Sequence, residues 1–119
     1  MPPGPPAANP TANPGPLDFD HLERMTLGEK ALEREVLEMF VAQSARLLDA
    51  LATLPPETPA LAHTLKGSAR AIGAFRVAEC AEALEVAIGQ GENCANCQIE
   101  LKAAVADACA AIDALLQRL

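Results

Sequence analysis

The sequence has no tryptophan or tyrosine, and its only aromatic side chains are Phe19, Phe40 and Phe75 among 119 residues. Strands usually draw on aromatic and β-branched residues, whereas alanine and leucine, which dominate the hydrophobic half of this chain, are strong helix formers. The composition therefore favours closely packed helices over a sheet. The length suits one domain and is too short for two.

Basic residues are also scarce, because nine Lys and Arg stand against 16 Asp and Glu, giving a net charge of -7. Nucleic acids and anionic membranes select cationic surfaces, and no run approaches the roughly 20 apolar residues of a membrane span. The N-terminus lacks the basic start and apolar stretch of a secretory signal. We therefore expect a soluble cytoplasmic protein that binds neither nucleic acid nor membrane.

Four cysteines are present, and without a secretory signal we expect them to be free thiols. Cys80 and Cys109 fall on apolar stripes, where cysteine behaves as a small core residue. Cys94 and Cys97 form a CxxC motif, which is half of a zinc site or a redox pair, but no second pair of ligands accompanies it. We place this motif at the start of the last helix and expect no metal site.

Residues 1–16 hold seven of the ten prolines and no charged side chain. Such a segment cannot bury a core. We therefore predict a disordered proline-rich tail over 1–16 and a folded domain over 17–119.

The domain opens with two predicted helices. A short one runs from Asp18 to about residue 25, with Phe19 and Leu22 pointing inward. A long one follows to about residue 54, with Thr26 as N-cap and Glu29 in the capping-box position. Its predicted apolar stripe consists of Leu32, Val36, Met39, Phe40, Leu47 and Leu51, and Glu33 lies outside that stripe.

Three further helices are predicted over 59–72, over 76–88 and from a start between 93 and 98 to the C-terminus. Gly73 ends the first of them, and Gly89 and Gly91 end the second. Four amphipathic helices joined by short breaks are typical of an antiparallel up-and-down four-helix bundle. We predict this all-α fold, with the short N-terminal helix capping the bundle.

One helical face carries the chemistry, in the stretch 62–74 that reads AHTLKGSARAIGA. At about 100° per residue, His63, Lys66, Gly67 and Arg70 share a face opposite the apolar positions. A glycine there costs roughly 1 kcal/mol relative to alanine, and the simplest compensation is that a bulky group can reach the imidazole. An exposed histidine, a cleared approach and two cations suit an anionic phosphoryl group.

The same stretch resembles the signature of histidine-containing phosphotransfer (HPt) domains, the relay modules of multistep two-component signalling, over residues 17–119. The resemblance rests on His63, Leu65, Lys66, Gly67, Ser68, Ala69, Gly73 and Ala74, followed by Cys80, Leu84 and Glu85. It implies the same helical bundle that the periodicity predicts.

By this resemblance His63 accepts a phosphoryl group from the aspartyl phosphate of one receiver domain and passes it to the aspartate of another. Lys66 would neutralise its charge, with Arg70 as a weaker second, and Gly67 would keep the approach open. Glu85 would make a polar contact between helices. His21, which lacks this setting, is expected to be a solvated helix residue.

The partners implied are response-regulator receiver domains and a hybrid sensor kinase, which would dock around His63 with contributions from Phe19, Leu22 and Met25. The receiver should supply Mg²⁺, because no acidic cluster accompanies His63 to hold it, and no cofactor of the chain's own is expected. Neither a Walker pattern nor GxGxxG occurs, so we expect a relay intermediate and not an ATP-dependent kinase. We expect a monomer.

Two other hypotheses stay open at this stage. One is a non-catalytic helical adaptor bundle, in which His63 is incidental and the acidic surface docks signalling partners. The other is a metal-binding bundle that uses His63 with Cys94 and Cys97. Neither accounts for a mid-helix glycine beside a histidine and a lysine.

Overall fold

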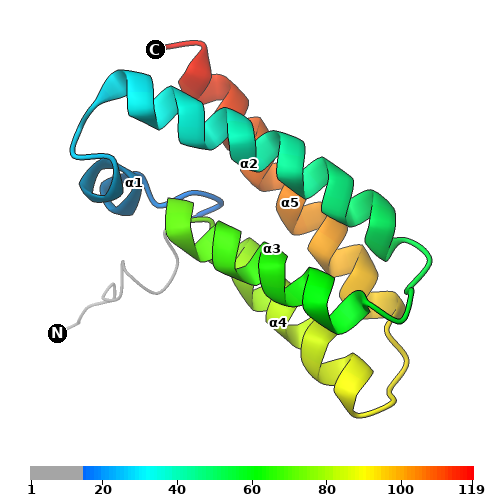
Figure 1. Cartoon of the computed structure of the whole chain (residues 1–119). Helices are drawn as coiled ribbons and strands as arrows, with labels where there is room; N and C mark the ends of the chain where they lie inside the picture. The colour runs from blue at the N-terminus through cyan, green and yellow to red at the C-terminus, as the bar shows by residue number, and fades with distance from the viewer. Residues whose placement is uncertain (1–14) are drawn as a thin grey trace, which may run out of the picture.

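Five helices make up the part of the chain that the computed structural model describes, residues 15–119 (Figure 1). No strand occurs among these residues, so the prediction of an all-α protein is confirmed. Of the predicted tail over 1–16, only the last two residues fall inside the described range. The helices are α1 (Phe19–Met25), α2 (Lys30–Leu51), α3 (Thr58–Ile72), α4 (Phe75–Gly89) and α5 (Ala95–Leu116).

The four long helices each pack against two of the others and form a ring in the order α2, α3, α4, α5. Successive helices of this ring run in opposite directions (Figure 1). The α3–α4 pair packs most closely, and the α2–α5 pair packs least. None of these helices within 15–119 is long and apolar enough to cross a membrane.

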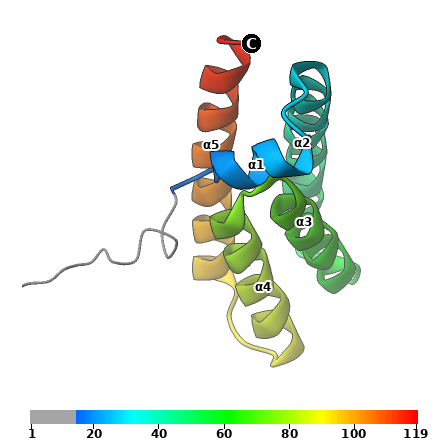
Figure 2. The ribbon, with the colours of Figure 1, turned by 90° about the vertical axis from the view of Figure 1, so that its left-hand side faces the viewer.

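The ring is uneven in length, because α2 and α5 have 22 residues each and α3 and α4 have 15. At 1.5 Å per residue the longer helices exceed the shorter by about 10 Å. They extend past the turn between α3 and α4, and α1 lies crosswise at that turn, against α3 (Figure 2).

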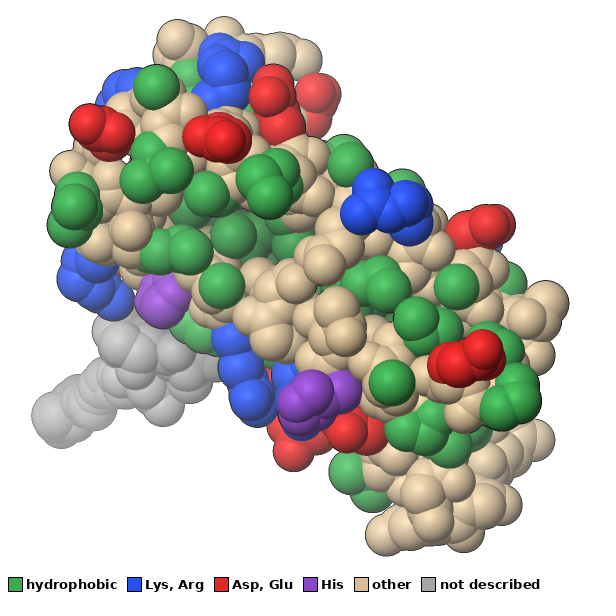
Figure 3. All heavy atoms as spheres, in the orientation of Figure 1, with side chains coloured by type: hydrophobic (Ala, Val, Ile, Leu, Met, Phe, Trp, Pro, Cys, Tyr) green, Lys and Arg blue, Asp and Glu red, His purple; other side chains and the backbone are tan. Residues whose placement is uncertain are grey.

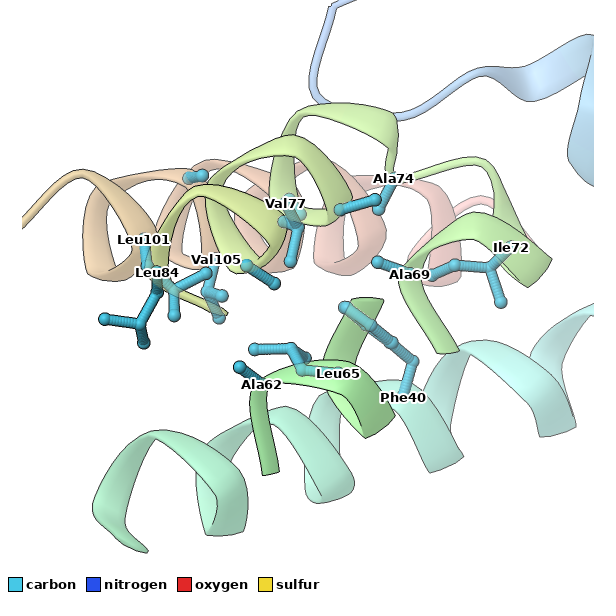
Figure 4. Packing of buried hydrophobic residues seen from close by; sticks show 14 of the residues in the cluster. Phe40, Ala62, Leu65, Ala69, Ile72, Ala74, Val77, Leu84, Leu101 and Val105 are labelled. Atoms are coloured by element: carbon cyan, nitrogen blue, oxygen red, sulfur yellow. The ribbon is translucent and has the colours of Figure 1, made fainter. Parts of the chain in front are cut away.

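The core is built from the inward stripes of the four long helices, whose side chains point toward one another in Figure 4. Alanines with no exposed surface, such as Ala62, Ala69, Ala81 and Ala108, alternate with larger residues and let the helix backbones approach closely. The larger core residues include Leu37, Phe40, Leu65, Val77, Leu84, Leu101, Val105 and Ile112.

The turn after α3 depends on Gly73, which ends the helix in the left-handed conformation with φ at +91°. The Asp18 backbone N–H donates to the Gly73 carbonyl at 2.9 Å, and this bond attaches the start of α1 to the turn. A Cβ at position 73 would lie 2.9 Å from the Asp18 carbonyl oxygen. The predicted helix stop is therefore also the site where α1 docks.

His21, predicted as a solvated helix residue, lies in α1 and is partly exposed, but it also takes part in this docking. Its Nε2 donates to the Ala71 carbonyl at 3.1 Å, and its ring meets the edge of Phe75 with centroids 5.1 Å apart. Phe19, which was predicted to point inward, is 48% exposed, whereas Leu22 is buried as expected.

The predicted N-cap of the long helix is wrong as well. Thr26 is the C-cap of α1, and its hydroxyl donates to the Leu22 carbonyl at 2.9 Å. The following helix begins four residues later, with Glu29 as an N-cap whose side chain makes no capping bond. The capping box fails because the preceding helix already uses the threonine hydroxyl.

The inward stripe of α2 also differs from its prediction. Met39 is 64% exposed, and Leu37 occupies the buried position in its place. Glu33, predicted to lie outside the stripe, is 4% exposed and lies 3.7 Å from Lys30 Nζ. The buried residues at helical spacing are Glu33, Leu37, Phe40, Ser44 and Leu51, two of them polar, and for this reason a search for apolar periodicity misplaces the stripe.

Candidate functional site

His63 projects from α3 on the side where α4 runs alongside, and its side chain is 68% exposed. Its Nδ1 lies 3.3 Å from Oε2 of Glu85, a residue of α4. Helical geometry puts this histidine opposite Leu65, which is fully buried. One face of α3 thus packs in the core while the other presents the imidazole to solvent.

Lys66 shares the Glu85 carboxylate with His63. Its Nζ donates to Oε1 of Glu85 at 3.1 Å, and its side chain is only 14% exposed. The pKa of Glu85 is lowered, chiefly by this hydrogen bond; burial acts in the opposite direction, and the charge of Lys66 and the contact with His63 lower the pKa further. Glu85 is therefore a carboxylate at neutral pH and makes the helix–helix polar contact expected of it.

Gly67 lies one turn beyond His63 on the same face, and a Cβ placed there would meet nothing within 4 Å. The space beside the imidazole is open, as the predicted access requires. Arg70 lies further along α3, where its Nη2 donates to Oε1 of Glu82 at 3.2 Å. Both cations of the predicted face are thus paired with glutamates of α4.

The Glu85 contact constrains the chemistry of the imidazole. A carboxylate only accepts hydrogen bonds, so its proximity to Nδ1 favours the tautomer that carries the proton on Nδ1. Nε2 then holds the lone pair. The arrangement provides an exposed nitrogen nucleophile whose ring is oriented by a neighbouring carboxylate.

Glu82 is the one member of this charged group that was not predicted from the sequence. The available signal was its position three residues before Glu85, which puts both carboxylates on one face of α4. Figure 3 shows histidine, basic and acidic side chains gathered on this side of the molecule.

The cysteines lie apart from this chemistry. All four are free, and Cys94 is the buried N-cap of α5, as the predicted place of the CxxC motif requires. Cys80 and Cys109, expected in the core, are only partly buried. Burial raises the pKa of the Cys80 and Cys97 thiols, which disfavours the thiolate that metal binding and redox exchange need. Over residues 15–119 no three His, Cys, Asp or Glu side chains are grouped so that they could hold a metal ion.

A groove of about 400 Å³ opens between α1, α2 and α3, on the side of α3 next to the histidine face. Phe40 and Ile72 are buried residues of its lining, and Met25 and Met39 are exposed ones. Figure 3 shows hydrophobic side chains gathered over α1 and the first half of α2.

Comparison with known families gives one result. The family model described as the Hpt domain matches residues 35–119, more than two-thirds of the chain, including all of α3, α4 and α5. Comparisons with curated proteins and with solved structures found no significant match. The matched region contains every residue of the charged group around His63. The chain therefore belongs to the Hpt domain family, whose members carry out histidine phosphotransfer in phosphorelays.

Proposed function

We propose that His63 is the phosphoacceptor and that the chain relays a phosphoryl group between the aspartates of receiver domains. One observation carries the proposal: inside the Hpt-matched region, an exposed imidazole has Glu85 against one nitrogen and open space at Gly67. The second histidine, His21, lies outside the matched region and bonds to the Ala71 carbonyl.

In the proposed step, Nε2 of His63 attacks the phosphorus of an aspartyl phosphate. A P–N bond forms while the P–O bond to the aspartate breaks, and the aspartate leaves as a carboxylate. The phosphorylated ring retains its Nδ1 proton and becomes cationic, so the carboxylate of Glu85 stabilises it. Transfer to a second receiver is the reverse of this step.

Lys66 is the cation best placed to neutralise the phosphoryl charge. It is bound to the same carboxylate as the imidazole, so a small movement of its flexible chain would bring Nζ to a phosphate oxygen. Arg70 is a weaker candidate, because it lies seven residues, about two helical turns, beyond His63, where it pairs with Glu82.

The catalytic Mg²⁺ would come with the receiver. The carboxylate beside His63 is Glu85, and it is already engaged by a lysine, which is a poor setting for a divalent cation. The chain would accordingly act as a relay intermediate with no cofactor of its own. Its phosphoryl group would originate from a hybrid sensor kinase.

Receivers would dock over the α1–α2–α3 groove and the histidine face together. Met25 and Phe19 are exposed on α1, and Met39 extends the apolar surface onto α2. Leu22, which is also predicted to contribute to this contact, is 1% exposed and belongs to the core. An apolar patch next to a charged reactive face is typical of a protein-docking surface.

The decisive experiment is phosphoryl transfer from a kinase–receiver pair loaded with labelled ATP. We expect an acid-labile, base-stable label on the wild-type chain, as a phosphohistidine requires. The variant His63→Gln should take up no label, because the nucleophile is gone. Its far-UV circular dichroism should match that of the wild type, since the side chain is exposed.

His21→Gln is the matched control and should retain the label. A label that survives His63→Gln would contradict the proposal. A wild-type chain that binds receivers but takes up no label from any of them would favour the adaptor hypothesis.

A further inference from the structure

A second cleft, of about 580 Å³, opens between the C-terminal half of α2 and the N-terminal half of α5. Its floor is apolar and reaches the core at Leu51, Leu84 and Leu101. The cleft lies at the seam where the ring of helices packs least closely. In the ring order this seam is opposite the α3–α4 seam that carries His63.

Small side chains line part of the rim of this cleft. Ala45 of α2, Ala52 at the C-cap of α2 and Ala95 of α5 have small side chains, so that a second backbone could come close. Beside them Ile99 is 65% exposed, a large apolar side chain that residues 15–119 leave mostly uncovered. Gln98 fixes the width at one end, because its Nε2 donates to the Leu51 carbonyl at 3.2 Å.

Opposite charges flank the cleft, with Asp49 on the α2 side and Lys102 on the α5 side. A twofold axis parallel to α2 and α5 would bring α2 of one copy against α5 of a second copy. Residues would keep their positions along the direction of the axis. Under that operation Asp49 faces Lys102 of the second copy, and the reverse pair forms as well. Ile99 then lies over the alanines of the opposing α2. The two rims of the cleft are thus complementary to each other in charge across a twofold axis.

We propose that the α2–α5 cleft is a homodimer interface, with Ile99 of each copy packed over the partner's cleft and Asp49 paired with Lys102 of the second copy. This inference goes beyond the proposed relay and replaces the expectation of a monomer. Both His63 side chains would face outward, so each copy could still engage its own receiver. Because each chain carries a charge of -7, the two copies repel each other and the dimer is expected to be weak.

The test is sedimentation velocity of the full chain over a wide concentration series. We expect the weight-average sedimentation coefficient to rise from a monomer value to a dimer value. Ile99→Glu should weaken association at least about tenfold, because it places a charge on the apolar contact. Met39→Glu is the matched control, since Met39 is equally exposed but lies in the other groove, and it should associate as the wild type does.

Exchanging the charges at Asp49 and Lys102 tests whether these two residues face each other across the twofold axis. This test does not depend on the folding of a single variant. Asp49→Lys and Lys102→Asp should each weaken association, because like charges then meet across the twofold axis. The double variant should restore it. A chain that stays monomeric at every concentration, or a dimer insensitive to both Ile99→Glu and the charge exchange, would overturn the proposal. His63→Gln should leave association unchanged, so that this test and the test of the relay are independent.

Discussion

At the scale of single residues, Glu85 connects the two groups that the proposed chemistry needs. One oxygen lies 3.3 Å from the imidazole Nδ1 and the other accepts from Lys66 at 3.1 Å. The carboxylate thus orients the nucleophile and holds a cation next to it at the same time. A phosphoryl group on Nε2 would compete with Glu85 for that cation, so the residue affects both stability and transfer.

Glu85→Gln is expected to lower the free energy of unfolding near pH 7 by about 1 kcal/mol or less, the range of partly exposed ion pairs. The pKa of Glu85 is lowered from its ordinary 4.5 in the folded chain, so its ion pairs stabilise the fold above pH 4.5. That stabilisation is lost as the pH falls through the lowered pKa. Urea unfolding followed by circular dichroism at several pH values should show that the free energies of unfolding of the wild type and of Glu85→Gln become equal in acid. A difference in free energy of unfolding that stays constant down to the lowest pH would contradict the ion-pair role of Glu85.

Gly67 offers a prediction in which stability and transfer change in opposite directions. Because a Cβ at position 67 meets nothing, Gly67→Ala should raise the free energy of unfolding by about 1 kcal/mol, the helix-propensity difference. Gly67→Leu should also remain folded, but its side chain would fill the space beside His63 and slow transfer. Unfolding curves together with initial rates of labelling measure both effects. Equal transfer rates for Gly67→Leu and the wild type would show that the glycine does not serve access.

At the scale of helices, sequence periodicity was most informative where the inward stripe is apolar. The helices α3, α4 and α5 begin and end close to their predicted bounds, because alanine, leucine and valine fill their buried positions. The stripe of α2 contains Glu33 and Ser44, while Met39 lies outside it, so the same reasoning misplaced that helix's buried face. Periodicity detects burial only where burial and hydrophobicity coincide.

The charged group shows the same limit. The shared face of His63 and Gly67 was predictable because it depends on spacing within one helix. The pairs that Arg70 makes with Glu82 and that Lys66 makes with Glu85 depend on how α3 and α4 are aligned along each other. That alignment is set by core packing and by the Gly73 turn, and it is not encoded in the pattern of either helix alone.

The turn that aligns α3 with α4 also positions α1, and Gly73→Ala tests it. Alanine at φ +91° is strained, and its Cβ would press on the Asp18 carbonyl at 2.9 Å. We expect a loss of about 1–3 kcal/mol in the free energy of unfolding. This is opposite in sign to the same substitution at Gly67, only six residues earlier, so the pair forms an internal control. Thermal unfolding measured by calorimetry gives the change in stability. A Gly73→Ala variant as stable as the wild type would mean that α1 docks without this turn.

At the scale of the whole molecule, the core and the reactive surface are separate, although the same helix carries both. Leu65 is fully buried and points into the core (Figure 4), whereas His63, two residues earlier, is exposed. Leu65→Ala should therefore lower the free energy of unfolding by about 2–5 kcal/mol through lost burial and the cavity left behind. At a temperature where the variant is still fully folded, its transfer rate should match that of the wild type. Calorimetry and labelling at matched folded fractions measure the two quantities. A folded Leu65→Ala variant that transfers far more slowly would show that core packing positions the imidazole, and that fold and site are coupled.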